Sequence, residues 1–163
     1  MIVESDGIVS GRFADRYGAK GTEFVGDMPS HSIPFRIRDA PKGTVCFAVV
    51  FEDFDAVPVC GFDWIHWTVA DLTSEEVPEG ESGKGTLIEG CNSWHGIGGD
   101  LTREQASAYG GMAPPDKEHE YTLTVYALDC KTGLGKGFYL NELRRAMKGH
   151  VLAHCTVAGT YAP

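Results

Sequence analysis

The segment Thr44–Phe51 (TVCFAVVF) constrains the fold more than any other, because nearly all of its residues are apolar. Such a run between turn residues is typical of a central β-strand that is buried on both faces. Trp64–Ala70 and Tyr121–Leu128 are rich in β-branched and aromatic residues, and Thr156–Tyr161 has the pattern of a closing strand. These segments predict a mainly β protein, a largely antiparallel β-sandwich.

Turn-forming residues are dense between these segments. The chain has 163 residues, of which 21 are Gly and 8 are Pro, whereas these two residues together make up about 12% of an average protein. They concentrate in Asp27–Pro34, Val77–Gly85 and Gly96–Pro115. No repeat or linker divides the sequence, so we expect residues 1–163 to form one domain.

Helical patterns are scarce and lie outside the predicted strands. From Asn141, the expected N-cap, apolar residues recur at helical spacing as far as Val151, and Gly149 is expected to end or kink this helix near the C-terminus. Thr102–Tyr109 predicts a second short helix. The helices are therefore expected to be few and peripheral.

The charge balance limits the partners. The chain has 14 Lys and Arg against 23 Asp and Glu, a formal net charge of −9, so we expect neither nucleic acid nor an anionic membrane surface to be a main partner. No apolar stretch approaches the ~18 residues of a membrane span, and the first residues lack the pattern of a secretory signal. The five cysteines show no C-x-x-C spacing. We therefore expect a cytoplasmic protein with reduced thiols and no integral membrane association.

Candidate site residues occur in three pairs at i, i+2 spacing: Asp53 and Asp55, Trp64 and His66, and His119 and Tyr121. In an extended chain this spacing places both members of a pair on one face. A carboxylate within ~4–6 Å of a histidine favours the imidazolium form, which donates hydrogen bonds from both ring nitrogens. The pairs thus predict a pocket for a small anion, even in an acidic protein.

Other interpretations of these residues remain open. A histidine within an apolar strand is usually a core residue, and aspartates in a turn usually cap backbone amides. His66, His119, Asp53 and Asp55 are also legitimate zinc or iron ligands, although no tight metal signature is present. The sequence has no P-loop, no G-x-G-x-x-G and no nucleophile elbow around Ser93, so we expect no cofactor and no catalytic residue.

Seven short motifs in order resemble the phosphatidylethanolamine-binding protein family, also called Raf kinase inhibitor-like proteins, in its bacterial and archaeal branch. The motifs are EDFDAVP (Glu52–Pro58), WIHW (Trp64–Trp67), EGCNS (Glu89–Ser93), YGGMAPP (Tyr109–Pro115), HEY (His119–Tyr121), YALD (Tyr126–Asp129) and AMKGHVLA (Ala146–Ala153). Each motif is weak alone, but their order and spacing cover the chain from about Ser32 to Tyr161.

This resemblance implies a β-sandwich of two antiparallel sheets with a pocket for phosphate-like anions. It implies that His66 and His119 donate to the anion while Asp53 and Asp55 orient and charge them. The rest of the implied ligand-binding set is Ala56, Trp64, Gly111, Ala113, Pro114, Pro115 and Tyr121. The sequence departs from the family pattern at Phe54, Val57, Met112 and Glu120. These departures put the shape of the loop and the strength of anion binding in question.

The resemblance implies a non-enzymatic protein that binds a phospholipid head group or another phosphorylated group. Family members have been linked to kinase regulation and protease inhibition, so a kinase or protease partner is open, as is the choice between monomer and homodimer. Two alternatives also stay open. One is a metal-assisted hydrolase that uses His66, His119, Asp53 and Asp55, and the other is a protein-interaction module that acts without the pocket.

Overall fold

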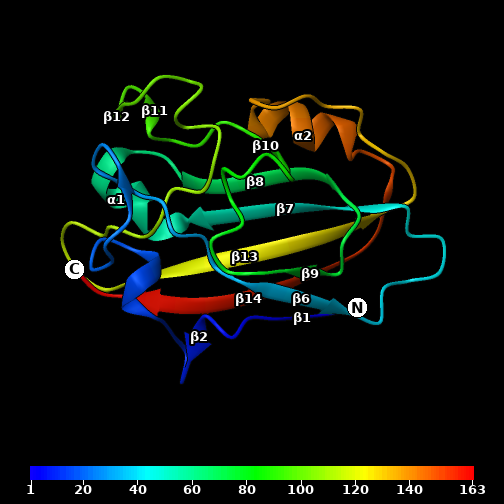
Figure 1. The fold of residues 1–163 in the computed structure, drawn as a ribbon, viewed down its shortest axis with the longest axis horizontal. Helices are drawn as coiled ribbons and strands as arrows, with labels where there is room; N and C mark the ends of the chain where they lie inside the picture. Colours follow the sequence, from blue (N-terminus) through cyan, green and yellow to red (C-terminus); the bar gives the residue numbers. More distant parts are fainter.

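The computed structural model describes residues 1–163 as two packed β-sheets with helices at the periphery (Figure 1). The strands are β1 (Ile2–Glu4), β2 (Ile8–Val9), β3 (Arg12–Phe13), β4 (Phe24–Val25), β5 (Met28–Pro29), β6 (Phe35–Arg38), β7 (Cys46–Asp53), β8 (Trp64–Leu72), β9 (Glu76–Val77), β10 (Ile88–Glu89), β11 (His95–Gly96), β12 (Gly99–Asp100), β13 (His119–Leu128) and β14 (Val151–Tyr161). The helices are η1 (Asp15–Tyr17), η2 (Phe54–Ala56), α1 (Val57–Cys60) and α2 (Leu140–Ala146), where η marks a 3-10 turn.

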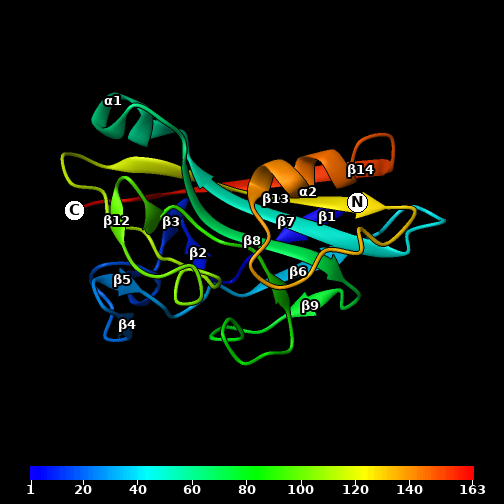
Figure 2. The ribbon, with the colours of Figure 1, turned by 90° about the horizontal axis from the view of Figure 1, so that it is seen from above.

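The larger sheet has the strand order β10-β8-β7-β13-β14-β3-β2, and the smaller sheet has the order β1-β6-β9. All neighbouring strands in both sheets are antiparallel except β14 and β3, which are parallel. Figure 2 shows the smaller sheet on one side of the larger sheet and α2 on the other. The predicted mainly β fold is therefore confirmed, and two small two-stranded sheets, β4 with β5 and β11 with β12, lie beside the two main sheets.

Strand β7 is buried along its whole length, as predicted for Cys46–Phe51, but it also includes the buried carboxylates Glu52 and Asp53, whereas Thr44 and Val45 lie before the strand. Phe47, Val49 and Phe51 belong to the main core between the sheets. Cys46, Ala48 and Val50 point the other way and pack in a second cluster with Leu143 and Met147 of the α2 region. Because side chains alternate along a strand, only a strand covered on both faces tolerates apolar residues at every position.

The boundaries of α2 differ from the prediction. The helix begins at Leu140, and its N-cap is Tyr139, whose backbone amide donates to the Glu142 carboxylate at 2.8 Å. Asn141 thus lies inside the helix, where its capping ability is unused. Gly149 adopts a left-handed conformation (φ 84°), and Val151 begins β14 instead of continuing the helix.

The predicted helix over Thr102–Tyr109 is wrong, because these residues form turns. Only Ala106 makes a helical contact here, donating its backbone amide to the Thr102 carbonyl. The Asn92 amide groups bond the carbonyls of Ala106 and Ala108 instead. These tertiary partners hold the chain in a different course.

A short helix that was not predicted, α1, follows β7 and η2 at the end of the sheet on the left of Figure 1. Pro58 lies in its first turn and Gly61 ends it with φ 90°, a typical start and stop pair. All five cysteines are unpaired, as expected. No helix in the structure has the length and apolarity needed to cross a bilayer.

Candidate functional site

A cavity of about 340 Å³ opens at this same end of the larger sheet, where β7 ends and β8 and β13 begin. Its lining residues are Asp27, Asp53, Ala56, Val59, Cys60, Trp64, His66, Trp94, Ala113, Pro114, Pro115, His119 and Tyr121. They come from η2 and α1, from three strands of one sheet, and from three loops. The antiparallel register brings segments that are far apart in sequence to one edge.

Most of the predicted ligand-binding residues lie together around this cavity. Those that line it are Asp53, Ala56, Trp64, His66, Ala113, Pro114, Pro115, His119 and Tyr121, whereas Asp55 and Gly111 do not. The two pairs at i, i+2 spacing within strands, Trp64 with His66 and His119 with Tyr121, do face one side, as strand geometry requires.

The Asp53 carboxylate forms hydrogen bonds with two elements, η2 and β13. Oδ1 accepts a hydrogen bond from the Ala56 backbone amide at 3.2 Å and thereby caps η2. Oδ2 lies 2.8 Å from Nδ1 of His119. Because the Asp53 side chain is only 5% exposed, its position is fixed by these partners, and it fixes the imidazole of His119 in turn.

His119 lies between two carboxylates. Its Nδ1 contacts Asp53, and its Nε2 lies 2.8 Å from Oδ1 of Asp116. Burial disfavours the charged ring, but the hydrogen bonds to the two aspartates outweigh this effect and raise the pKa of His119 above its ordinary value. The hydrogen bond from His119 correspondingly lowers the pKa of Asp116. The two aspartates therefore favour the imidazolium form of His119, as the carboxylate argument predicts.

His66 behaves differently from the expectation that it would be charged. The side chain is buried, and Nδ1 lies 2.7 Å from the Gly110 carbonyl oxygen. Burial lowers the pKa of His66 to about 4, and the Gly110 hydrogen bond only partly opposes this. Near neutral pH, Nδ1 therefore carries the proton that it donates to Gly110, which leaves Nε2 as a hydrogen-bond acceptor. Burial therefore argues against the predicted imidazolium form of His66.

Tyr121 contributes a buried hydroxyl that has no hydrogen-bond partner. Burial raises the pKa of Tyr121 well above its ordinary value, and the adjacent Asp53 carboxylate adds to this through its charge and by attracting the hydroxyl proton, so the hydroxyl keeps its proton. The Tyr121 ring packs against His66 with centroids 5.2 Å apart. Since buried polar groups are nearly always paired, this hydroxyl on the cavity wall is available to a bound molecule.

Asp55 and Gly111 support the site from outside the cavity. Asp55 lies in η2, where the extended spacing does not apply, and its Oδ2 accepts from the Glu120 backbone amide at 2.9 Å. It therefore ties the loop to β13. The same-face prediction for Asp53 and Asp55 is wrong for this reason. Gly111 donates its backbone amide to the Pro29 carbonyl at 2.7 Å, and a Cβ atom there would overlap the Tyr17 carbonyl oxygen.

The four departures from the family pattern lie outside the cavity lining. The Glu120 side chain is exposed, as its alternation with His119 and Tyr121 predicts. Phe54 and Val57 are also exposed, and Met112 is buried in the main core. These substitutions alter the surroundings of the cavity without adding a side chain to its wall.

Sequence reasoning missed four lining residues: Asp27, Val59, Cys60 and Trp94. Val59 and Cys60 belong to α1, which Pro58 and Gly61 could have indicated. Trp94 packs edge-on against His66, with ring centroids 5.3 Å apart, and its place in a glycine-rich loop was the available signal. No local pattern indicates Asp27.

Comparisons with known proteins agree with this geometry. The family model for phosphatidylethanolamine-binding protein matches residues 4–162. The YxkA protein of Bacillus subtilis is 43% identical over 152 residues, which cover 90% of this chain and 87% of that protein. A UPF0098 protein of Chlamydia trachomatis is 30% identical over 148 residues, with coverages of 90% and 87%.

Two crystal structures share the fold. A phosphatidylethanolamine-binding protein homologue from Chlamydia trachomatis superposes with a TM-score of 0.78 at 28% identity, covering 98% of this chain and 95% of that one. YbcL of E. coli has a TM-score of 0.77 at 24% identity, with coverages of 98% and 96%, and supports the fold alone. Given the match over residues 4–162, the chain belongs to the phosphatidylethanolamine-binding protein family.

Proposed function

We propose that the chain is a non-enzymatic binding protein whose cavity takes a small ligand with a phosphoryl group. The observation that carries this proposal is the unpaired, buried hydroxyl of Tyr121 on a cavity wall that also holds the cationic ring of His119. A hydroxyl donor beside an imidazolium suits an anionic oxygen, because charge-assisted hydrogen bonds are about twice as strong as neutral ones.

The other polar groups of the cavity restrict the chemical class of the ligand further. Nε2 of His66 is an acceptor, and the carboxylate of Asp27 also lines the cavity. A ligand that carries a hydrogen-bond donor as well as a phosphoryl oxygen would satisfy both kinds of group. The head group named in the family, phosphoethanolamine, has this composition, since it joins a phosphate to an ammonium.

The direct test is a titration followed by NMR on the imidazole signals of the folded protein. We expect inorganic phosphate and O-phosphoethanolamine to shift the signals of His66 and His119 together, with O-phosphoethanolamine binding more tightly. Sulfate and free ethanolamine separate the contribution of the anion from that of the ammonium. If saturating phosphate and O-phosphoethanolamine move neither histidine, the proposal is wrong.

The placement of the residues does not favour the metal-assisted hydrolase. Asp55 is turned away from the cavity toward Glu120, and Nδ1 of His66 is taken by the Gly110 carbonyl. The His66, His119, Asp53 and Asp55 side chains therefore do not converge as ligands of one ion, and they are not among the groups of the chain that could hold a metal. Near-stoichiometric zinc or iron that is lost with His66→Ala would reverse this conclusion.

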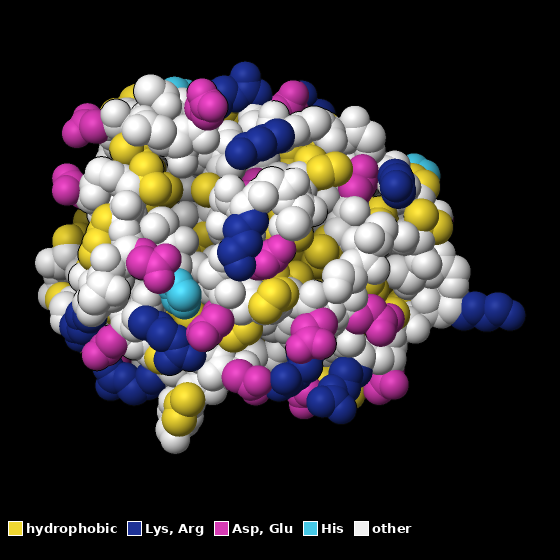
Figure 3. Space-filling view, in the orientation of Figure 1, with side chains coloured by type: hydrophobic (Ala, Val, Ile, Leu, Met, Phe, Trp, Pro, Cys, Tyr) yellow, Lys and Arg dark blue, Asp and Glu magenta, His cyan; other side chains and the backbone are white.

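A protein-interaction role is the second candidate, because apolar side chains are exposed beside the cavity. Phe54, Val57, Val59 and Phe62 are each at least 40% exposed, and Ile97 is fully exposed. In Figure 3 hydrophobic side chains gather at the left, over the α1 end of the molecule. A kinase or protease docked on this surface would be released by Val57→Asp but not by His66→Ala, whereas a phosphoryl ligand would show the reverse.

A further inference from the structure

Asp129, Cys130 and His150 form a second cluster of chemically versatile side chains. Asp129 and Cys130 follow the last residue of β13, and His150 precedes the first residue of β14. Since the cavity lies where β13 begins, this cluster is at the opposite end of the larger sheet, on the right in Figure 1. Nothing in the proposed phosphoryl site uses these residues.

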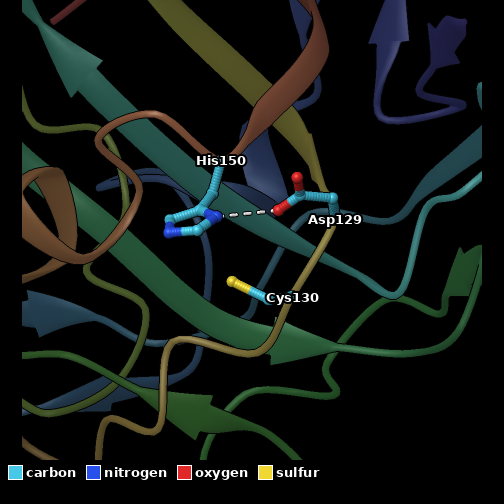
Figure 4. Close-up of side chains that lie close together, drawn as sticks. All are labelled: Asp129, Cys130 and His150. Atoms are coloured by element: carbon cyan, nitrogen blue, oxygen red, sulfur yellow. Dashed lines mark hydrogen bonds and ion pairs between the residues drawn. The ribbon is translucent and has the colours of Figure 1, made fainter.

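The three side chains point toward one another (Figure 4). Nδ1 of His150 lies 2.8 Å from Oδ1 of Asp129, and one ligand atom from each of the three residues lies within 4.8 Å of the others. Asp129 and His150 are about half exposed, with side-chain exposures of 45% and 46%, while Cys130 is partly buried. The cluster is thus open to ions from solution.

The backbone holds these residues in place from both sides. The Asp129 amide donates to the His150 carbonyl at 3.1 Å, which extends the β13–β14 ladder by one pair. The Cys130 carbonyl accepts from the Cys46 thiol at 3.2 Å. Beyond it, the Asp71 carboxylate accepts from the amides of Thr132 and Gly133. A donor set on a fixed backbone needs only side-chain rotations to close around an ion.

We propose that Asp129, Cys130 and His150 are three ligands of a zinc site, with the fourth position open to water. Zinc accepts thiolate, imidazole and carboxylate ligands together, in tetrahedral geometry with bonds of about 2.0–2.3 Å. Such bonds place neighbouring ligand atoms roughly 3.3–3.8 Å apart, so the existing cluster needs a small outward shift of the exposed Asp129 and His150 side chains. Binding removes the thiol proton of Cys130, which goes to solvent, and requires His150 to be neutral with its one ring proton on the nitrogen that faces away from the metal, so the His150–Asp129 hydrogen bond is exchanged for two metal bonds.

The test uses Co²⁺ as a spectroscopic substitute for zinc, on the full chain without a polyhistidine tag and with the thiols kept reduced. We expect one Co²⁺ per chain, with visible bands of a tetrahedral ion and a sulfur-to-cobalt charge-transfer band in the near ultraviolet. Added Zn²⁺ should abolish these bands in a stoichiometric titration. Absence of the charge-transfer band at saturating Co²⁺ would overturn the proposal.

Variants of the cluster, compared with matched control variants in β14, locate the ion. Cys130→Ser should remove the charge-transfer band, and His150→Ala should weaken Zn²⁺ binding by about tenfold or more. Cys155→Ser and His154→Ala, which change the same residue types in β14 outside the cluster, should leave binding unchanged. A band that survives Cys130→Ser, or that is lost with Cys155→Ser, places the ion elsewhere and overturns the assignment. Phosphate binding in the cavity is measured separately, so the two proposals stand or fall independently.

Discussion

Oδ1 of Asp116 lies 2.8 Å from Nε2 of His119, on the ring nitrogen that Asp53 leaves free. The two carboxylates differ in exposure: the Asp53 side chain is 5% exposed, whereas that of Asp116 is 49% exposed. Asp53 is therefore the permanent partner of the ring, and Asp116 is a replaceable one. In the proposed complex, we expect a phosphoryl oxygen to take the place of the Asp116 carboxylate at Nε2.

Asp116→Asn should strengthen phosphate binding, because it removes the negative charge that competes for Nε2 and repels the ligand. The loss of one charge-assisted contact corresponds to about 1 kcal/mol, or about fivefold in affinity. Calorimetric titration of both proteins at a pH well below the pKa of His119, where the ring is charged in both, measures the change, and the pKa of His119 should fall in the variant. Asp39→Asn, an exposed aspartate with φ 53° that asparagine tolerates, is the charge-matched control. A lowered pKa of His119 with unchanged affinity would contradict replacement of Asp116 by the ligand.

The two cavity histidines should titrate on opposite sides of the ordinary value. NMR titration is expected to give a pKa of about 4 for His66 and a pKa above 6.5 for His119. Phosphate affinity should then fall as the pH rises through the pKa of His119, because the imidazolium donor is lost. If affinity instead follows the titration of His66, then His66 and not His119 carries the positive charge that binds phosphate.

Tyr121→Phe should have opposite effects on stability and on binding. An unpaired buried hydroxyl is unfavourable in the free protein, so its removal is expected to stabilise the fold by about 1 kcal/mol. The same change removes a donor to the ligand and should weaken phosphate binding by about tenfold. Thermal unfolding with and without phosphate measures both effects. A destabilised variant would mean that the hydroxyl has a partner in the free protein.

Glu52 should make stability depend on pH. Its side chain is 6% exposed, and burial together with the nearby Asp63 raises the pKa of Glu52 to about 7, although Arg144 opposes this. Because the pKa in the unfolded chain is about 4.5, stability is lost as the pH rises from about 4.5 to about 7. Glu52→Gln should therefore stabilise the protein by about 1–2 kcal/mol at pH 8 and have little effect at pH 4.5. Chemical denaturation at the two pH values decides this, with the exposed Glu104→Gln as the control.

Gly111→Ala should lower the free energy of unfolding by about 3 kcal/mol, because its Cβ would overlap the Tyr17 carbonyl oxygen and contact Pro29. Backbone atoms cannot rotate away as a side chain can. Gly135→Ala is the matched control, since a Cβ there meets nothing within 4 Å. Equal stability of the two variants would mean that the wall segment is free to shift.

The long strands were predictable because their sequences report burial directly. Cys46–Phe51 is apolar at every position, and such a strand is stable only when both of its faces are buried. The loop after β7 was not predictable in the same way, because the short turn η2 depends on Asp53 accepting from Ala56. Because Asp55 lies in this turn and not in a strand, it does not share a face with Asp53 as predicted.

The chemistry of the site was predictable only in part. The in-strand pairs at i, i+2 spacing identify the side chains on the cavity wall, because alternation is a local property. The charge state of His66 is not local, since it depends on burial by segments distant in sequence, including Gly110 and Trp94. The contact between Asp116 and His119 depends on a loop conformation that residue spacing does not specify.

The Asp53 carboxylate connects the His119 ring to the loop that follows β7. One oxygen holds Nδ1 of His119 and the other holds the Ala56 amide at the start of the exposed α1 end. A change in the charge of the His119 ring therefore alters the hydrogen bond of the Ala56 amide, because one carboxylate contacts both groups. We therefore expect the hydrogen-exchange rate of the buried Ala56 amide to change when the His119 ring gains or loses a partner.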